Sequence, residues 1–306
     1  MKHFVLCLIL AGTLSAATPT YEDARAAIQK RDFAGALAIL RPLADDGNPQ
    51  AQSALGVLYA NGLGIRQSYE EGVSWFIKSA QQGYAEAQSN LAMAYLAGQG
   101  IKQDPVAAGA WFRKAADQGN AAAQYNLANL LHEGTGITKS DIEAVSLYRS
   151  GAEQNYLPAI EGLGTMYMNG FGVPKSQEEG LKQYKMAAEK GLAQAQYDVG
   201  VVYLQGLGVA KDPKESVTWF QKAASQGFPR ALTALGLLAD AGDGLPKDPV
   251  EAYKWLMLAS IQGDDAAKQV MADLSKRVTP AQVDQAKKAA QEWIKTAQAK
   301  NGQTAK

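Results

Sequence analysis

The chain has 306 residues, of which 47% are hydrophobic and 20% are charged, a composition that excludes a disordered chain and one embedded in a membrane. Lys and Arg number 30 and so do Asp and Glu, so no overall field favours nucleic acid as a partner.

Residues 1–17 are typical of an export signal. Lys2 gives a positive start, residues 5–14 form an apolar run, and small residues end at Ala17. The run is too short to span a bilayer, so we expect no integral membrane span. Cleavage near Ala17 would place the chain in the periplasm or outside the cell. The alternative is a buried first helix.

Cleavage would also remove most of the side chains that bind metals or act as nucleophiles. Cys7 is the only cysteine, and His3 and His132 are the only histidines, so His132 alone would remain. We therefore predict no metal site, no cofactor and no catalytic residues.

Two short helices are expected before the regular part of the chain. Apolar residues at helical spacing predict helices over 20–30 and 33–46, and Gly47 ends the second. Residues 18–50 are therefore interpreted as an N-terminal capping pair.

The rest of the chain is organised by a repeat of 36 residues. An Ala opens a first helix, helix A, six times, and a period of this size indicates stacked helical units. The six predicted repeats are 51–86, 87–122, 123–158, 159–194, 195–230 and 231–266. Together they form one domain, 51–266.

Helix A is expected to end in a Gly-x-Gly-aliphatic elbow, for example at 206–209. A phosphate-binding loop is excluded because no strand precedes it, no Gly-Lys-Ser/Thr follows it, and it recurs in every repeat. A small residue in the middle of helix A, such as Gly200, indicates a close approach between helices.

Helix B follows the elbow and should begin at a strong N-cap. Ser or Asp stands at this position in every repeat, as at Asp212, and Glu215 three residues later suggests a capping box. Five of the six repeats have such a Glu. These acids are better interpreted as caps than as paired catalytic carboxylates.

After residue 266 the Gly-x-Gly elbow is lost. Residues 267–306 are interpreted as C-terminal capping helices and a tail, with Thr279 as the N-cap of the last helix. Trp293 and Ile294 are expected to fold back on the last repeat.

The repeated pattern A-x-x-x-[LV]-[GA]-x-x-Y-x-x-G-x-G-[IVL], followed by a capped helix with an aromatic pair, resembles the Sel1-like repeat, a relative of the tetratricopeptide repeat. The resemblance covers residues 51–266. It implies an all-α fold, an α/α solenoid that winds as a right-handed superhelix, with helix A lining a concave face. Members of this family act mostly as adaptors or scaffolds, and exported members are associated with the bacterial envelope.

On that face, the residues that are not needed for packing between helices lie two, six and nine positions after the opening Ala. These offsets share one stripe of the helix. The candidate protein-binding residues are Met93, Tyr125, Asn129, His132, Glu161, Thr165, Met168, Tyr197, Val201 and Leu204. For the tyrosines, packing between helices is the alternative. His132 could be a core or solvent residue, and Glu161 could be merely solvated.

The sequence thus predicts a non-catalytic exported adaptor or scaffold that binds a protein or peptide in the envelope or outside the cell and regulates it. The alternative, by family analogy alone, is a cell-wall-related enzyme or glycan binder, such as a weak penicillin-binding hydrolase, with Glu161 and His132 as its candidate pair. Cysteine-rich relatives suggest that activity, and this chain lacks their cysteines.

Overall fold

The computed structural model describes residues 18–303, and every regular element in that range is an α-helix. The expected export signal, residues 1–17, lies outside the described residues. None of the described helices is both long enough and apolar enough to cross a membrane.

The chain divides into two compact units, residues 1–111 and 112–306, which are described separately. Helix α6 (Pro105–Asp117) contains the division. Unit 1 holds α1 (Tyr21–Gln29), α2 (Phe33–Asp45), α3 (Pro49–Asn61), α4 (Tyr69–Gln81) and α5 (Ala85–Ala97). The helices of unit 2 are α7 (Ala121–Glu133), α8 (Asp141–Glu153), α9 (Leu157–Asn169), α10 (Gln177–Glu189), α11 (Ala193–Gln205), α12 (Pro213–Ser225), α13 (Pro229–Ala241), α14 (Pro249–Ile261), α15 (Asp265–Leu274) and α16 (Pro280–Gln303).

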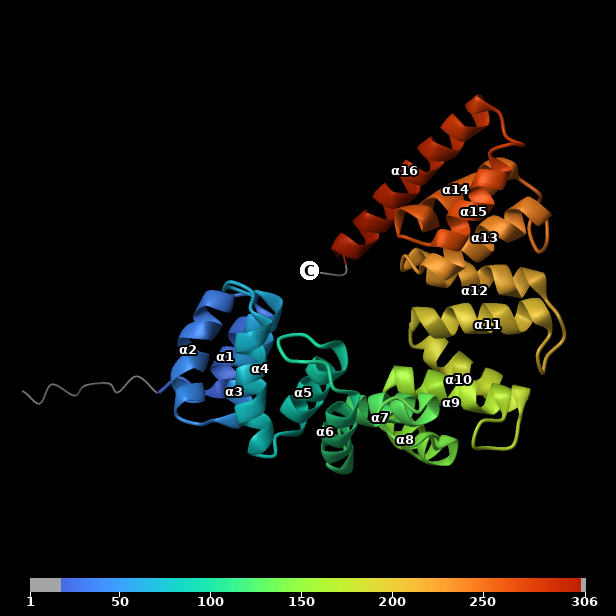
Figure 1. Ribbon diagram of the computed structural model, residues 1–306. Helices are drawn as coiled ribbons and strands as arrows, with labels where there is room; N and C mark the ends of the chain where they lie inside the picture. Colours follow the sequence, from blue (N-terminus) through green and yellow to red (C-terminus); the bar gives the residue numbers. More distant parts are fainter. Residues whose placement is uncertain (1–17, 304–306) are drawn as a thin grey trace, which may run out of the picture. The chain divides into compact units, whose positions relative to one another are not determined.

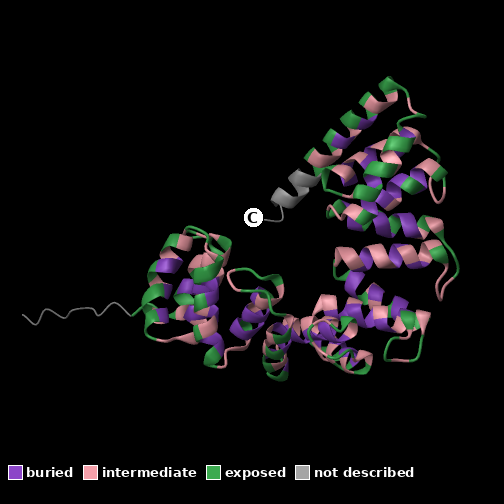
Figure 2. Ribbon diagram, viewed as in Figure 1, coloured by how far each residue is buried: buried purple, intermediate pink, exposed green. Residues whose placement is uncertain are grey.

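Within each unit, helices that follow one another along the chain pack together as antiparallel neighbours, except that α16 packs on α14 instead of α15 (Figure 1). Buried residues lie on the helix faces turned toward neighbouring helices (Figure 2). Because each repeat covers the apolar face of the next, the buried side chains form successive clusters along the stack; in unit 1 one cluster joins α1, α2 and α3 and another joins α4 and α5. The predicted all-helical repeat fold is confirmed.

The frame of the repeat differs from the expected one by two residues. Helix A of the fifth repeat begins at Ala193 instead of Ala195, because Leu192 already has the extended backbone of an N-cap residue. The opening alanines lie fully buried in the first turn, so they mark a packing position and not the helix start.

The glycines have the roles that the sequence suggested. In the elbow of the fourth repeat, Gly172 has φ +68°, and a Cβ there would lie 2.3 Å from the carbonyl oxygen of Asp141 in the preceding helix B. A Cβ on Gly200 would lie 2.6 Å from the ring of Phe220. Both positions therefore exclude a side chain, one at the turn and one between helices A and B.

The helix B caps form, but the capping boxes do not. Asp212 accepts hydrogen bonds from the backbone amides of Lys214 and Glu215 at 3.1 and 3.0 Å. The amide of Asp212 itself donates to the carbonyl of Tyr203 in helix A, at 2.8 Å. The predicted box was wrong because this amide is already bonded; Glu215 instead accepts from the indole of Trp219 at 2.8 Å.

The C-terminal helices cover the end of unit 2 as predicted. α16 begins at Pro280 after the Thr279 cap, whose hydroxyl accepts from the amide of Gln282. Trp293 packs edge-on against Trp255 of α14, with ring centroids 5.7 Å apart. This aromatic contact joins the last helix to the core of the final repeat.

Candidate functional site: the helix A surface of unit 2

The candidate residues of unit 2 lie on α7, α9 and α11. The exposed sides of these helices and of α13 form what we call the helix A surface. In α7, the ring of Tyr125 packs against Tyr148 and Tyr156, with centroids 6.0 and 5.8 Å away. The Tyr148 hydroxyl donates to the amide oxygen of Asn129 at 2.5 Å. Tyr125 and Asn129 thus both contact Tyr148 of α8, the helix B of their repeat, and both remain partly exposed.

His132 is held by neighbours on two elements. Its Nδ1 lies 2.6 Å from a carboxylate oxygen of Asp141, the first residue of α8. Its ring packs on Phe171 of the next elbow, with centroids 5.0 Å apart. Among the described residues no contact joins His132 to Glu161, so the catalytic pair suggested for the enzyme alternative does not form.

In α9, Thr165 contacts a carboxylate and a phenol hydroxyl, whereas Met168 is buried in the core. The Thr165 hydroxyl lies 3.1 Å from a carboxylate oxygen of Glu161 and 2.9 Å from the hydroxyl of Tyr184. Burial raises the pKa of Tyr184, so this phenol stays protonated. Met168 is 8% exposed, because Gly180 of α10 leaves room for its thioether. It contributes to the core and offers little surface to a partner.

The most unusual chemistry of this surface is a pair of carboxyls from neighbouring repeats. The carboxyls of Glu161 of α9 and Asp198 of α11 lie within hydrogen-bonding reach of each other, and both are partly buried. Gln194 donates to both oxygens of Asp198, at 3.0 and 3.1 Å. Burial, together with the charge of Glu161, raises the pKa of Asp198 to about 7. Burial also raises the pKa of Glu161. The pair therefore holds a proton near neutral pH.

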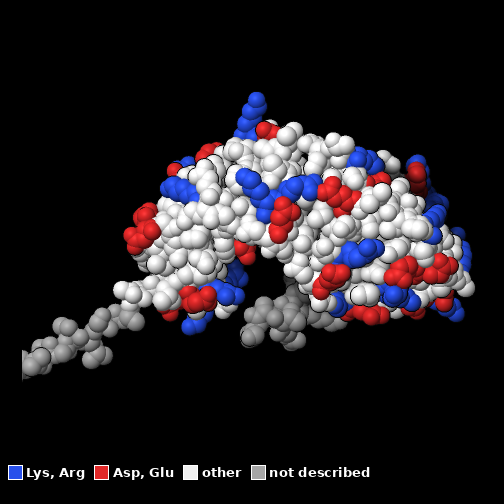
Figure 3. Space-filling view, turned by 90° about the horizontal axis from the view of Figure 1, so that it is seen from below, with Lys and Arg blue, Asp and Glu red and all other residues white. Residues whose placement is uncertain are grey.

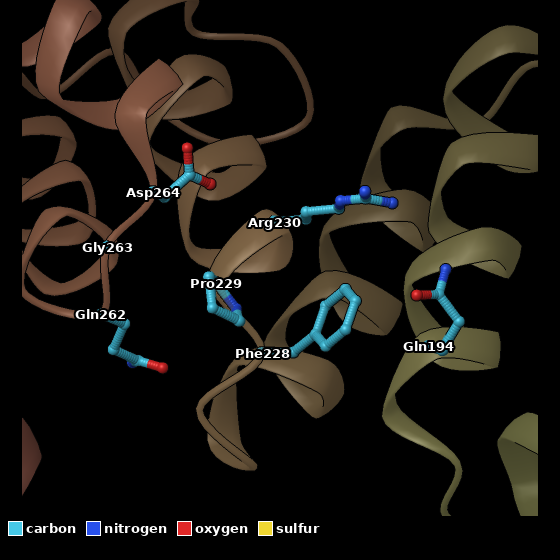
Figure 4. Close-up of a pocket in the computed structure, with 7 residues that line it drawn as sticks. All are labelled: Gln194, Phe228, Pro229, Arg230, Gln262, Gly263 and Asp264. Atoms are coloured by element: carbon cyan, nitrogen blue, oxygen red, sulfur yellow. The ribbon is translucent and has the colours of Figure 1, made fainter. Parts of the chain in front are cut away.

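A groove opens beside this pair, over the first turns of α11, α13 and α15 (Figure 4). One part, about 480 Å³, lies between Gln194, Phe228 and Asp264. The second part, about 310 Å³, continues along Tyr197 and Leu237, and Arg230 and Asp264 line both parts. The two parts adjoin at these two charged residues, and we call the side of Tyr197 and Leu237 the apolar section of the groove.

Arg230 supplies the positive charge of the groove. Its side chain extends across the pocket toward α11 in Figure 4. In the part of the chain that the structure describes, its guanidinium makes no ion pair or direct hydrogen bond, although it acts electrostatically on Asp198 and Tyr197. Because an Arg side chain is always charged and the N–H groups of Arg230 are unused, Arg230 can donate hydrogen bonds to a carboxylate or a carbonyl group of a partner.

The remaining candidates form or border the apolar section. Tyr197 packs between Phe220 and Phe228, with centroid distances of 5.4 and 5.6 Å. Val201 and Leu204 are partly buried against the same core cluster. Met93 belongs to unit 1, where it is 45% exposed beside a separate pocket.

Sequence reasoning missed Asp198 and Arg230. Asp198 lies three residues after the opening Ala, one position off the stripe that periodicity selects. Arg230 precedes the opening Ala and was therefore placed before the helix, whereas α13 begins at Pro229. The sequence does contain a sign of this pair of acids: Asp198 lies 37 residues after Glu161, which is one residue more than the 36-residue repeat.

The rest of the surface carries charge of both signs. On the face shown in Figure 3, acidic and basic side chains are interspersed without a large area of one sign. The groove, with its apolar section beside Arg230 and the carboxyl pair, is therefore a local feature of unit 2.

Fold and surface together define an all-α protein of tandem helix pairs with a groove on its helix A side. The family model described as Sel1 repeat matches residues 49–84, 85–120, 121–156, 157–192, 193–228 and 229–264. The chain belongs to the Sel1 repeat family. A comparison with curated proteins gives no match.

Solved structures support this assignment. A Sel1 repeat protein from Oxalobacter formigenes is 32% identical, with a TM-score of 0.74 over 78% of this chain and 96% of that one. A protective antigen of uropathogenic Escherichia coli is 30% identical, with a TM-score of 0.65 over 92% of this chain. The match spans 60% of the antigen's length. An immunity protein from Pseudomonas aeruginosa, 21% identical with a TM-score of 0.50 over 70% of this chain and 81% of that one, shares the fold.

Proposed function

We propose that the chain is an exported, non-catalytic binding protein that holds a segment of a partner protein on the helix A surface of unit 2. The observation that carries the proposal is the groove, where an exposed Arg230 without an ion pair adjoins the apolar section formed by Tyr197 and Leu237. Aromatic and Arg side chains beside partly exposed apolar groups are the composition of binding hot spots.

The charged and apolar residues of the groove indicate which kind of partner segment can bind there. Arg230 can donate hydrogen bonds to a carboxylate or a backbone carbonyl, while Leu237, which is 46% exposed, can cover an apolar side chain. A partner segment with an acidic or carbonyl group next to an apolar residue satisfies both. Export is supported by residues 1–17, and the partner would then lie in the envelope or outside the cell.

A crosslinking experiment tests the binding surface. A photoreactive amino acid at Leu237, in the groove, should capture one discrete protein in cells, identified by mass spectrometry. The same group at Ile261, which is 70% exposed but outside the groove, is the matched control. Arg230→Glu should then weaken binding of the purified partner. Equal capture from both positions, or unchanged binding by Arg230→Glu, would contradict the proposed surface.

Hydrolysis of a cell-wall glycan is the second candidate, because the Glu161–Asp198 pair shares a proton as catalytic carboxyls do. Purified chain incubated with peptidoglycan should release no reducing sugars under our first proposal. If reducing sugars are released, and the release is lost in Asp198→Asn but kept in the exposed control Asp273→Asn, the binding proposal must be replaced by a catalytic one.

A further inference from the structure

We infer that unit 1 carries a separate socket that takes one uncharged, flexible apolar side chain, such as Met or Leu, from an extended segment of a partner. The residues that line the socket come from α3, α4, α5 and the elbow after α5; the three helices are labelled in Figure 1. It does not depend on the groove of unit 2, since all its residues belong to unit 1.

The socket is a depression of about 340 Å³ with apolar walls. Val57 and Ala60 of α3, Val73 and Phe76 of α4 and Met93 of α5 line it, and of these Val73 and Phe76 are buried. Met93 is 45% exposed, so apolar surface remains uncovered there. Burying such surface under a partner side chain is favourable because it removes apolar area from water.

The socket is open because the first repeat lacks the side chains that fill its counterparts. Ala60 stands where the third repeat has His132 and the fourth has Met168. Gln99 of the elbow stands where Phe171 packs on His132. The small Ala60 and the exposed Gln99 therefore leave space that two rings occupy in unit 2.

The fourth repeat shows which side chain suits this space. Met168 is buried there in one cluster with Leu181 and Tyr184, the counterparts of Val73 and Phe76. Met is flexible enough to fill an irregular gap of this kind. A partner side chain entering over Ala60 would take the place that the fourth repeat gives to its own methionine.

The electrostatics of the socket exclude a charged occupant. None of the residues that line it is acidic or basic, so an ionised side chain would lose water without gaining a counterion. The polar groups that line it are the phenol of Tyr69 and the amides of Asn61, Asn90 and Gln99, all of them uncharged. The side chain of Asn90 makes no hydrogen bond within residues 18–303, and its amide can both donate to and accept from one peptide unit. An apolar residue in an extended backbone is the electrostatic complement of this site.

Methyl NMR of the full chain tests the socket. Methionine methyl groups are labelled with ¹³C, and the Met93 signal is assigned through Met93→Leu. The probes are the N-acetyl methylamides of leucine, methionine, aspartate and lysine. The leucine and methionine probes should shift the Met93 signal saturably at millimolar concentration, and the charged probes should need at least tenfold more.

Ala60→Met should fill the socket from within. We expect it to weaken the leucine probe at least tenfold and to leave the melting temperature equal or higher, as cavity filling does. Ala38→Met, at an exposed position of α2, is the control and should bind like the wild type. Gln99→Phe provides a second block from the elbow if Ala60→Met fails to fold.

Two results would overturn the inference: undiminished leucine binding in both folded blocking variants, or equal shifts from the aspartate and leucine probes. Because the readout is Met93 in unit 1, failure of crosslinking at Leu237 in unit 2 would leave this result unaffected.

Discussion

Replacing Asp198 by Asn should stabilise the protein above neutral pH and flatten its pH dependence. Asp198 is partly buried beside Glu161, and the resulting pKa of about 7 means that folding opposes its ionisation. An Asn amide can keep both contacts, because its NH₂ can donate to Glu161 and its oxygen can accept from Gln194. The substitution therefore removes the charge while retaining the hydrogen bonds.

The magnitude follows from the pKa values of the folded and unfolded chains. A carboxyl whose pKa rises from about 3.8 to about 7 on folding holds more protons in the folded state between those values. Stability therefore falls as the pH rises through this window, and the full penalty is present above pH 7. At about 1.4 kcal/mol per pH unit the upper limit is about 4 kcal/mol. Partial exposure to water reduces it, and we expect about 2 kcal/mol.

Urea unfolding of the wild type and Asp198→Asn between pH 5 and pH 8 measures this effect. The variant should be more stable by about 2 kcal/mol at pH 8, and the difference should shrink toward pH 5. Asp273→Asn, which removes an exposed carboxylate paired with Lys276, is the control and should not reproduce this pattern. The reasoning fails if Asp198→Asn keeps the wild-type slope or is less stable at pH 8.

Three further predictions concern the repeat and the export signal. Gln196→Ala should lower the free energy of unfolding by about 1–3 kcal/mol, because the buried Gln196 amide donates a hydrogen bond to the Ala188 carbonyl at 3.1 Å. Urea titration checks this, with Gln205→Ala at an exposed position as the control. Asp212→Ala should cost about 1 kcal/mol in the same assay, since two first-turn amides lose their acceptor. Expression in a bacterial host should yield a periplasmic or secreted chain whose mass shows cleavage near Ala17, and an intact N-terminus would refute export.

The parts of the fold that follow from single residues could be predicted from the sequence. Positive φ at the elbow requires glycine, and a helix start without free amides requires an acceptor such as Asp212. These requirements recur in every repeat, so the period makes them visible. The capping boxes were overpredicted because a residue pattern does not show that the Asp212 amide is bonded to helix A.

The candidate site was harder to predict because it is formed between helices. Periodicity places Glu161 on an exposed stripe, but only the packing of α9 beside α11 brings it against Asp198. Met168 was expected on the surface for the same reason. Its burial depends on Gly180 in the facing helix, and the pattern of one helix does not contain that information.

The position nine residues after the opening Ala shows how this fold can vary its surface without losing its core. It is Ala60, His132, Met168 and Leu204 in four repeats, and the structure gives each a different environment: an open socket, a hydrogen bond to a carboxylate, the core and a partly covered apolar patch. The elbow, cap and opening Ala are constant in all of them, so the backbone does not depend on this side chain. The sequence at this position therefore determines whether a repeat closes its own groove or leaves it available to a partner.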